Sequence, residues 1–235
     1  MTEDATHLGY GAVGKALFFV IPAVLGAGIG LALHFLLGWL LGLPWLPFQG
    51  PLKLLDRIPD QVALPVLIGL GLVAGVIFGV YALAEELSIT VTRDSVRLQR
   101  GDLDRTLRRS TVAAVFLDGK ELVLLGPDTN ELAREKTDQS ASRLAAAFTY
   151  HGFPWQPDGD PREADYRVWS KSAVGLPPGA DALLAIRAKA LTDAKRAADT
   201  AELRAELIKL GVVVRDRGGK QYWRLGGGGP DQLLR

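Results

Sequence analysis

The sequence predicts an α+β membrane protein with two apolar helices, a small β domain closed by one helix, and a C-terminal module of helices and a β-hairpin. Two long uncharged segments predict the apolar helices, and alternating apolar and polar residues between turn signals predict the β domain. The expected organisation is an N-terminal tail 1–15, a helical hairpin 16–84, a β domain 85–157, a linker 158–179, a C-terminal module 180–225 and a flexible tail 226–235.

The two apolar segments, 16–43 and 62–84, contain no charged residue. About 20 apolar residues cross a 30 Å hydrocarbon core, so each segment is long enough to span a bilayer. The acidic start MTEDATHLGYG argues against a cleaved signal peptide. The short Pro- and Gly-containing link between the segments places both chain termini on one side of the membrane.

Basic residues favour the cytoplasm for that side. Cytoplasmic flanks of membrane helices carry an excess of Lys and Arg. Lys15 precedes the first helix and three arginines follow the second, whereas the link between the helices holds two basic residues: Arg93, Arg97 and Arg100 against Lys53 and Arg57. We therefore expect a multi-pass protein of the cell membrane with both termini in the cytoplasm.

Glycines recur every four residues on both apolar segments, as Gly26 and Gly30 on the first and Gly71, Gly75 and Gly79 on the second. Small residues at this spacing let helix backbones approach closely in a membrane. The two helices are expected to pack on each other. The alternative is that the stripe binds a protein partner or a second copy of the chain.

The β domain is predicted from short runs such as ELSITVT, SVRLQR, LDRTLRR, TVAAVFLD and ELVLLG, and a helix from Ser140 to Tyr150 closes it. Arg105, Arg108 and Arg109 lie close in sequence to the membrane segments. They are candidates to bind anionic lipid headgroups, at roughly 1 kcal/mol per basic residue near the surface. The alternative is that they form a solvated strand face.

Strands closed by one C-terminal helix after a membrane hairpin resemble the bacterial pleckstrin-homology-like (PH-like) domains. The segments VTRDSVRLQR, VAAVFLDGKELVLL, ELAREK and AFTYHGFPW resemble the uncharacterised bacterial family called YqeB. This resemblance continues into the C-terminal module and implies relatives without implying an activity.

In the C-terminal module a helix is predicted from Ala180 to Ala198, and Asp199 with Glu202 resembles a capping box for a second helix that Gly211 closes. Val212 to Val214 is predicted as a strand. A turn with two glycines leads to a returning strand, Gln221 to Arg224.

The same module resembles the anticodon-binding region of cysteinyl-tRNA synthetases. The matching features are Ala198-Asp199, Arg204-x-Glu206-Leu207, Gly211 with the valines after it, Asp216, Gly219 and Trp223-Arg224. The resemblance implies RNA contacts: phosphates for the basic side chains, base stacking for the tryptophan and a base edge for the aspartate. The candidates are Arg187, Lys195, Arg196, Arg215, Asp216, Trp223 and Arg224. The alternative is that Asp199, Gly211 and Trp223 only maintain the fold.

No catalytic pattern is found in the sequence. There is no cysteine, and His7, His34 and His151 lack ligand spacing, so neither a metal site nor a cofactor is predicted. Residues 85–160 carry a net charge of −3 and residues 181–235 carry +4. We expect a non-enzymatic, membrane-anchored cytoplasmic binding or adaptor protein. The alternative is a membrane-tethered RNA-binding protein, and transport is disfavoured because His34 has no acidic partner in the apolar segments.

Overall fold

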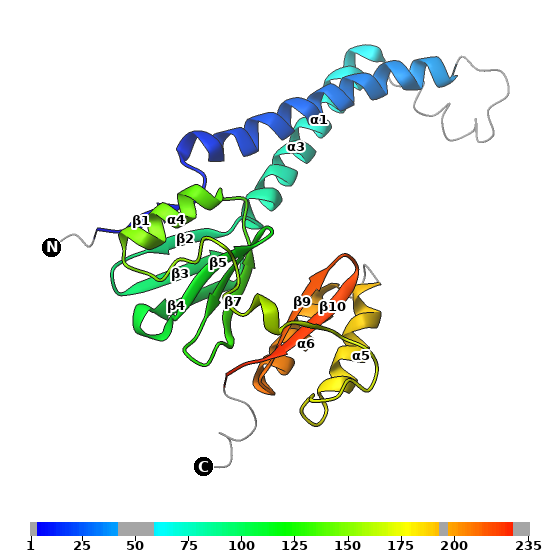
Figure 1. Cartoon of the computed structure of the whole chain (residues 1–235). Coiled ribbons are helices and arrows are strands. Elements are labelled where there is room, and N and C mark those ends of the chain that lie inside the picture. Colours follow the sequence, from blue (N-terminus) through cyan, green and yellow to red (C-terminus); the bar gives the residue numbers. More distant parts are fainter. Residues whose placement is uncertain (1–3, 42–58, 193–196, 228–235) are drawn as a thin grey trace. The chain divides into compact units, whose positions relative to one another are not determined.

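The computed structural model describes residues 4–41, 59–192 and 197–227, which form two compact units (Figure 1). One unit comprises residues 9–86 with the turn 100–102, and the other comprises the remainder of the chain. The predicted α+β class is confirmed, since apolar helices, β sheets and C-terminal helices with strands are all present.

Two long helices make up most of the first unit, α1 (Ala12–Leu41) and α3 (Asp60–Ala84). The stretches Val13–Leu36 and Gln61–Ala84 are long and apolar enough to cross a membrane. The predicted spans 16–43 and 62–84 thus begin a few residues late. Most of the link between the helices lies outside the described residues.

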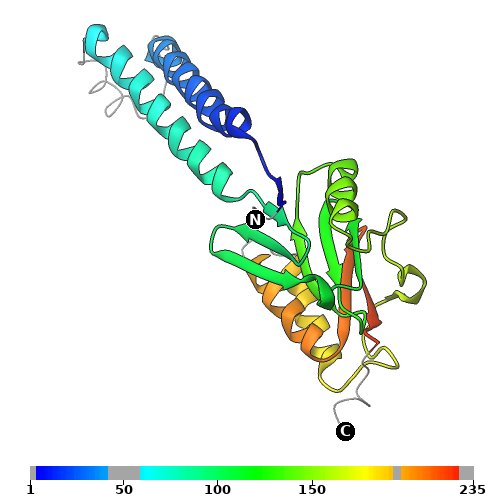
Figure 2. The ribbon, with the colours of Figure 1, turned by 90° about the vertical axis from the view of Figure 1, so that its left-hand side faces the viewer.

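The glycine stripe packs α1 against α3, which run side by side in both views (Figures 1 and 2). A Cβ atom added to Gly26 would lie 2.0 Å from the carbonyl oxygen of Gly71, and one added to Gly75 would lie 2.0 Å from that of Pro22. The expected packing of the two helices on each other is therefore observed. Association with another chain through the same glycines would have to displace this intramolecular contact.

Seven strands and one α-helix of the described residues form the PH-like domain. The strands are β2 (Ser88–Val91), β3 (Ser95–Arg100), β4 (Leu103–Arg108), β5 (Ala114–Asp118), β6 (Glu121–Leu125), β7 (Glu131–Lys136) and, from the N-terminus, β1 (Thr6–Leu8). They make a four-stranded sheet in the order β1-β2-β3-β4 and a three-stranded sheet in the order β5-β6-β7. The sequence runs chosen for β2 to β6 coincide with these strands, whereas β1 and β7 were missed.

Strand β1 corrects the assignment of residues 1–15 to a tail. It pairs antiparallel with β2, with Thr6 opposite Val91 and Leu8 opposite Ile89. The side chain of Leu8 is buried, and Thr6 is hydrogen-bonded to His151 at 2.8 Å. The helical hairpin is therefore inserted between two paired strands of one sheet.

The core of the PH-like domain lies between its two sheets and α4 (Ala141–Tyr150). Ser140 caps α4 by accepting a hydrogen bond from the backbone of Arg143, as expected for a serine at this position. Leu144, Ala147 and Phe148 face the sheets. A smaller cluster, including Phe116 and Val123, is buried on the other face of β5 and β6, so both faces of that sheet are covered.

The C-terminal module consists of two helices and a three-stranded sheet. Its elements are α5 (Ala180–Leu191), α6 (Ala197–Lys209), β9 (Val212–Arg217), β10 (Lys220–Leu225) and β8 (Arg167–Val168), in the sheet order β8-β10-β9. β8 comes from the predicted linker, which also contains the short 3-10 helix η2 (Glu163–Asp165). Asp199 lies in the first turn of α6 rather than before it. Gly211 adopts φ +72° after α6, as predicted for a helix end.

Candidate functional site

A basic pocket lies at one end of the first sheet. It has a volume of about 670 Å³ and is lined by the β2–β3 turn, the end of β4 with the short 3-10 helix η1 (Arg109–Thr111), and the segment after α4. The lining residues are Arg93, Asp94, Arg108, Arg109, Ser110, Val112, Gly152 and Pro154. The lining thus includes three arginines and one aspartate, with Val112 and Pro154 as apolar residues.

Arg109 is the fixed member of this pocket. Its backbone N–H donates to the carbonyl of Asp94 at 2.7 Å, and its Nε donates to the carbonyl of Gly152 at 2.9 Å. Gly152 has φ +74°, and a Cβ atom there would lie 3.1 Å from the Arg109 guanidinium. Glycine at this helix end thus leaves space for the arginine to lie against the backbone.

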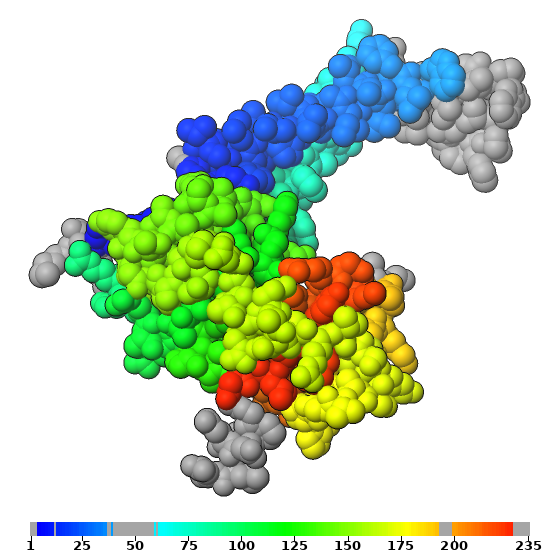
Figure 3. All heavy atoms as spheres, in the orientation of Figure 1, coloured from blue at the N-terminus to red at the C-terminus, as the bar shows by residue number. Residues whose placement is uncertain are grey.

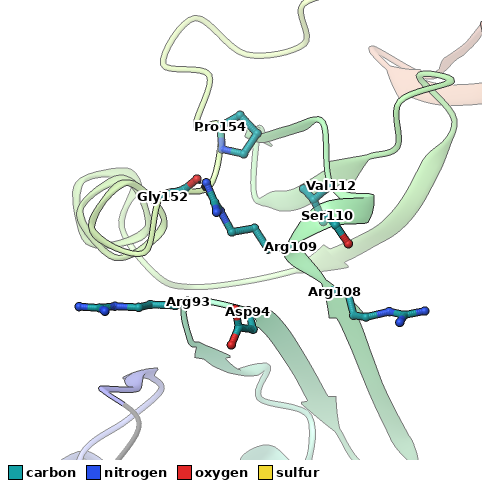
Figure 4. A pocket seen from close by; sticks show the side chains of 8 residues that line it. All are labelled: Arg93, Asp94, Arg108, Arg109, Ser110, Val112, Gly152 and Pro154. Carbon is teal, nitrogen blue, oxygen red and sulfur yellow. Dashed lines mark hydrogen bonds between the residues drawn. The ribbon is translucent and has the colours of Figure 1, made fainter.

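All three arginines are exposed, and they point in different directions. Figure 4 shows Arg109 directed toward Gly152, while Arg93 and Arg108 extend toward opposite sides of the pocket. Within the part of the chain that the structure describes, neither Arg93 nor Arg108 has an ion-pair partner. The pocket therefore presents uncompensated positive charge.

The structure brings together two of the three residues predicted for lipid headgroups. Arg108 and Arg109 line the pocket, whereas Arg105 is exposed on β4 outside it. The sequence did not indicate Arg93 as a site residue, because it lies in a different turn from Arg108 and Arg109. The strand order β2-β3-β4 brings that turn to the same pocket. Headgroup binding by these arginines stays a prediction.

A second charged region, which is largely buried, joins the PH-like domain to the C-terminal module. Arg134 on β7 lies at its centre, with 4% of its side chain exposed, and contacts Asp118 at 3.0 Å, Glu121 at 2.7 Å and Glu131 at 2.8 Å. Burial acts to lower the pKa of Arg134, but the nearby carboxylates outweigh it and raise that pKa. Three carboxylates thus share one buried cation, and Glu131 and Asp118 also pair with arginines of the C-terminal module.

The network continues into the module through Arg204. This side chain lies 3.5 Å from Glu131 and 3.6 Å from Asp216, and its burial lowers the pKa of the guanidinium. Asp216 also accepts two hydrogen bonds from Arg187, at 2.7 and 2.6 Å. Asp216 therefore links α5 and α6 to β9.

The linker supplies the outer part of this network. Glu163 accepts hydrogen bonds from Arg215, one of 2.9 Å, and the Tyr166 ring lies with its centroid 4.1 Å from the Arg215 guanidinium. The bond from Arg215 holds the pKa of Glu163 below its ordinary value. Arg224 donates to the carbonyl of Thr129 at 2.9 Å and lies 3.7 Å from Asp160. In Figure 3 the yellow-green part of the chain lies beside both the green PH-like domain and the red module.

Most of the residues predicted to contact RNA are buried within this arrangement. Arg187 and Arg224 are 1% exposed, Trp223 is 3% and Arg215 is 4%. Trp223 packs in the core of the module, so neither ring face is available to a base. The carboxylate of Asp216 accepts hydrogen bonds from Arg187. Lys195 and Arg196 lie outside the described residues. The four buried candidates therefore take part in contacts within the fold, and RNA contact by the predicted residues stays a prediction.

Two of the three histidines, His7 and His151, make hydrogen bonds within the PH-like domain. His151 holds β1 through Thr6, and His7 is hydrogen-bonded to Thr90 on β2 at 3.0 Å. Among the described residues, no group of three or more His, Asp or Glu side chains is arranged to hold a metal ion.

A four-stranded and a three-stranded sheet closed by one helix define a PH-like domain. The chain belongs to the family of YqeB-like bacterial PH domains, whose model matches residues 6–156. The match begins at β1 and runs through the helical hairpin, in agreement with the insertion seen in the structure. It places the protein in a family known by its fold rather than by an activity.

Two further similarities concern the whole chain and the module. A relative from Bacillus subtilis (strain 168), described as "Uncharacterized protein YqeB", is 38% identical over 226 residues, which cover 95% of this chain and 94% of the relative. Residues 173–224 are similar to the cysteinyl-tRNA ligase anticodon binding domain. No solved structure matches the chain.

Proposed function

We propose that this protein is a membrane-anchored binding protein whose PH-like domain and C-terminal module lie together on the cytoplasmic side. The observation that supports this most is the apolar surface of α1 and α3. Phe35, Ile77 and Phe78 are each more than 60% exposed within their unit. An exposed apolar surface along two 24-residue stretches is what a lipid bilayer solvates.

The connections support a short tether. Only residues 9–11 separate β1 from α1, and only residues 85–87 separate α3 from β2. Three extended residues span at most about 11 Å. Because β1 pairs with β2, the start of α1 and the end of α3 are each connected to one of two neighbouring strands. This geometry suits an anchor that holds a folded domain near the bilayer.

The cytoplasmic orientation rests on the distribution of basic residues described above. Binding rather than catalysis is supported by the matching families, which are described as a PH domain and as an anticodon-binding domain. The role is therefore that of an adaptor, which presents a binding surface at the membrane.

Cysteine labelling tests the topology, because the natural chain contains no cysteine. Gln49→Cys lies in the link between the helices, and Ser142→Cys lies on the exposed side of α4. In intact bacterial spheroplasts a membrane-impermeant maleimide should label the first variant, and it should label the second only after permeabilisation. Equal labelling of both in intact cells would exclude the proposed orientation.

RNA binding is a second candidate function, favoured by the similarity of residues 173–224 to an anticodon-binding domain. Since the described candidates on the module are mostly buried, the exposed basic residues of its hairpin, Arg217 and Lys220, are the ones to test. Full-length protein in a neutral detergent should retain tRNA on a filter at physiological salt, and Arg217→Gln with Lys220→Gln should weaken retention. Affinity equal to that for an unstructured RNA of the same charge would argue against this function.

A further inference from the structure

Strand β4 forms one edge of the first sheet, whose order is β1-β2-β3-β4 (Figure 1). Its exposed residues are Asp104, Arg105, Thr106 and Arg108. In the part of the chain that the structure describes, β3 is the one strand that pairs with β4. An edge strand presents unpaired backbone N–H and C=O groups, which can pair with a strand of another chain.

The backbone hydrogen bonds determine which groups of β4 are free. The N–H of Arg109 donates to the carbonyl of Asp94, at the start of β3. In an antiparallel pair, residues bonded to the neighbouring strand alternate with residues whose backbone groups point away from it. Counting back from Arg109, the N–H and C=O groups of Asp104, Thr106 and Arg108 therefore point outward.

These outward groups limit how two copies of β4 can pair. Outward groups must meet outward groups, so only registers centred on a residue rather than between two residues are allowed. The register centred on Thr106 places this residue opposite itself and places Asp104 opposite Arg108 of the second copy. Opposite charges and Thr–Thr pairs across neighbouring strands both stabilise a sheet.

The other registers bring like charges together. Centring the pair on Asp104, Arg105 or Arg108 places that charged residue opposite itself. Centring it on Leu107 places Arg105 opposite Arg109. Like charges directly opposite each other destabilise a sheet, and charged side chains on an edge normally oppose pairing for this reason. The charges of β4 thus favour one register and oppose the rest.

The groups that would meet in this register can accept the new contacts. Among the described residues, Arg108 has no ion-pair partner. Asp104 accepts hydrogen bonds from Arg97 of β3, one of 2.7 Å, and a carboxylate has room for further donors. The carbonyl of Arg108 accepts from the Thr111 hydroxyl at 2.7 Å, and its second lone pair can take an N–H from another strand.

We propose that this edge is a dimer interface, at which β4 pairs antiparallel with β4 of a second copy of the chain in the register centred on Thr106. The first sheets of the two copies then form one continuous sheet. A second copy is the partner because the twofold axis makes the pair between Asp104 and Arg108 twice. The proposal does not depend on the proposed function, since the labelling experiment on topology reports on neither residue.

Disulfide cross-linking tests the register, because the natural chain contains no cysteine. Opposite residues in a hydrogen-bonded antiparallel pair have Cα atoms about 5.5 Å apart, within the range of a disulfide. In native membranes treated with copper phenanthroline, full-length Thr106→Cys should form a covalent dimer. Ser142→Cys, on the exposed side of α4, should not. Equal cross-linking of both variants, or capture of a different protein by Thr106→Cys, would overturn the proposal.

The mass of the full chain in a mild neutral detergent tests the charges. Light scattering after size exclusion should give twice the mass of one chain. Arg108→Asp places like charges opposite each other twice and should raise the dimer dissociation constant about tenfold, while Arg108→Lys should retain the dimer. Arg143→Asp makes the same change of charge on the exposed side of α4 and should have no effect. Equal weakening by Arg108→Asp and Arg143→Asp would show a general effect of charge and contradict the interface.

Thr106→Pro tests the backbone contacts. Proline removes the outward N–H of this residue and no bond to β3, and edge strands tolerate proline at such positions. The dimer should be lost, with the thermal midpoint measured to show that the chain still folds. A dimer that survives in Thr106→Pro would mean that two copies associate through another surface. If Thr106→Pro is unfolded, Arg108→Asp still decides, because it breaks no ion pair of the described chain.

Discussion

Glu163 of the linker accepts hydrogen bonds from Arg215 of β9, which lies 52 positions later in the sequence. Tyr166 lies against the same guanidinium. The linker is thus a structural part of the contact between the PH-like domain and the C-terminal module.

Replacing this carboxylate should make the contact weaker. In Glu163→Gln the module is expected to open more readily, seen as faster amide hydrogen exchange in β9 and β10. Asp158→Asn removes an exposed carboxylate from the same linker and should leave the exchange unchanged.

The contact should also respond to acid. The pKa of Glu163 is lower in the folded protein than its ordinary value, so its stabilising contribution is complete above about pH 4.3. That contribution is lost as the pH falls through the folded-state pKa. Exchange in β9 of the wild type should rise over this acid range, and the rise should be smaller in Glu163→Gln. Identical pH profiles would contradict the assignment.

Arg134 is expected to be the most sensitive charged residue. Arg134→Met leaves Asp118, Glu121 and Glu131 without their shared cation, and breaking a buried ion pair costs about 3–5 kcal/mol. Urea unfolding followed by tryptophan fluorescence should show this loss. Lys120→Met removes an exposed pair with Asp138 and should change the free energy of unfolding by less than about 1 kcal/mol.

The glycines of the hairpin allow a matched comparison. Gly26→Val should push α1 away from Gly71, whereas Gly28→Val adds a side chain where no atom lies within 4 Å. Overpacking typically costs about 1–3 kcal/mol. After heating in a mild detergent, less of the Gly26→Val protein should remain monodisperse on size exclusion. A similar loss in Gly28→Val would show that close packing is not the cause.

Strand β1 should contribute to the stability of the PH-like domain. Leu8 is 4% exposed in the core, and truncating a buried leucine costs about 2–5 kcal/mol. Leu8→Ala should therefore lower the urea midpoint, while His7→Ala, on the exposed face of the same strand, should have a much smaller effect. An unaltered midpoint in Leu8→Ala would mean that residues 6–8 are dispensable.

Sequence patterns predicted local features well. Apolar length located α1 and α3, and alternation located β3 because Val96 and Leu98 are buried while Arg97 is exposed. β1 was missed because three residues, THL, are too few to show alternation, and its partner lies beyond both long helices.

The candidate site was predicted in part for a related reason. Arg108 and Arg109 are adjacent in sequence, but Arg93 joins them only through the pairing of strands. The RNA candidates show the converse. Basic and aromatic residues suggested an RNA-binding surface. In the structure Arg187 is buried and pairs with Asp216, and Trp223 is buried in the apolar core of the module. Charge alone does not separate a cation that binds a ligand from one that pairs internally.

The insertion of the hairpin between β1 and β2 has a consequence for biosynthesis. His7 and Thr90, which lie opposite each other, are 83 positions apart, so β1 leaves the ribosome long before its partner exists. The first sheet can be completed only after both long helices have been made and placed. Until α3 and β2 have been synthesised, β1 has no partner strand, so the first sheet stays incomplete during most of the synthesis of residues 9–91.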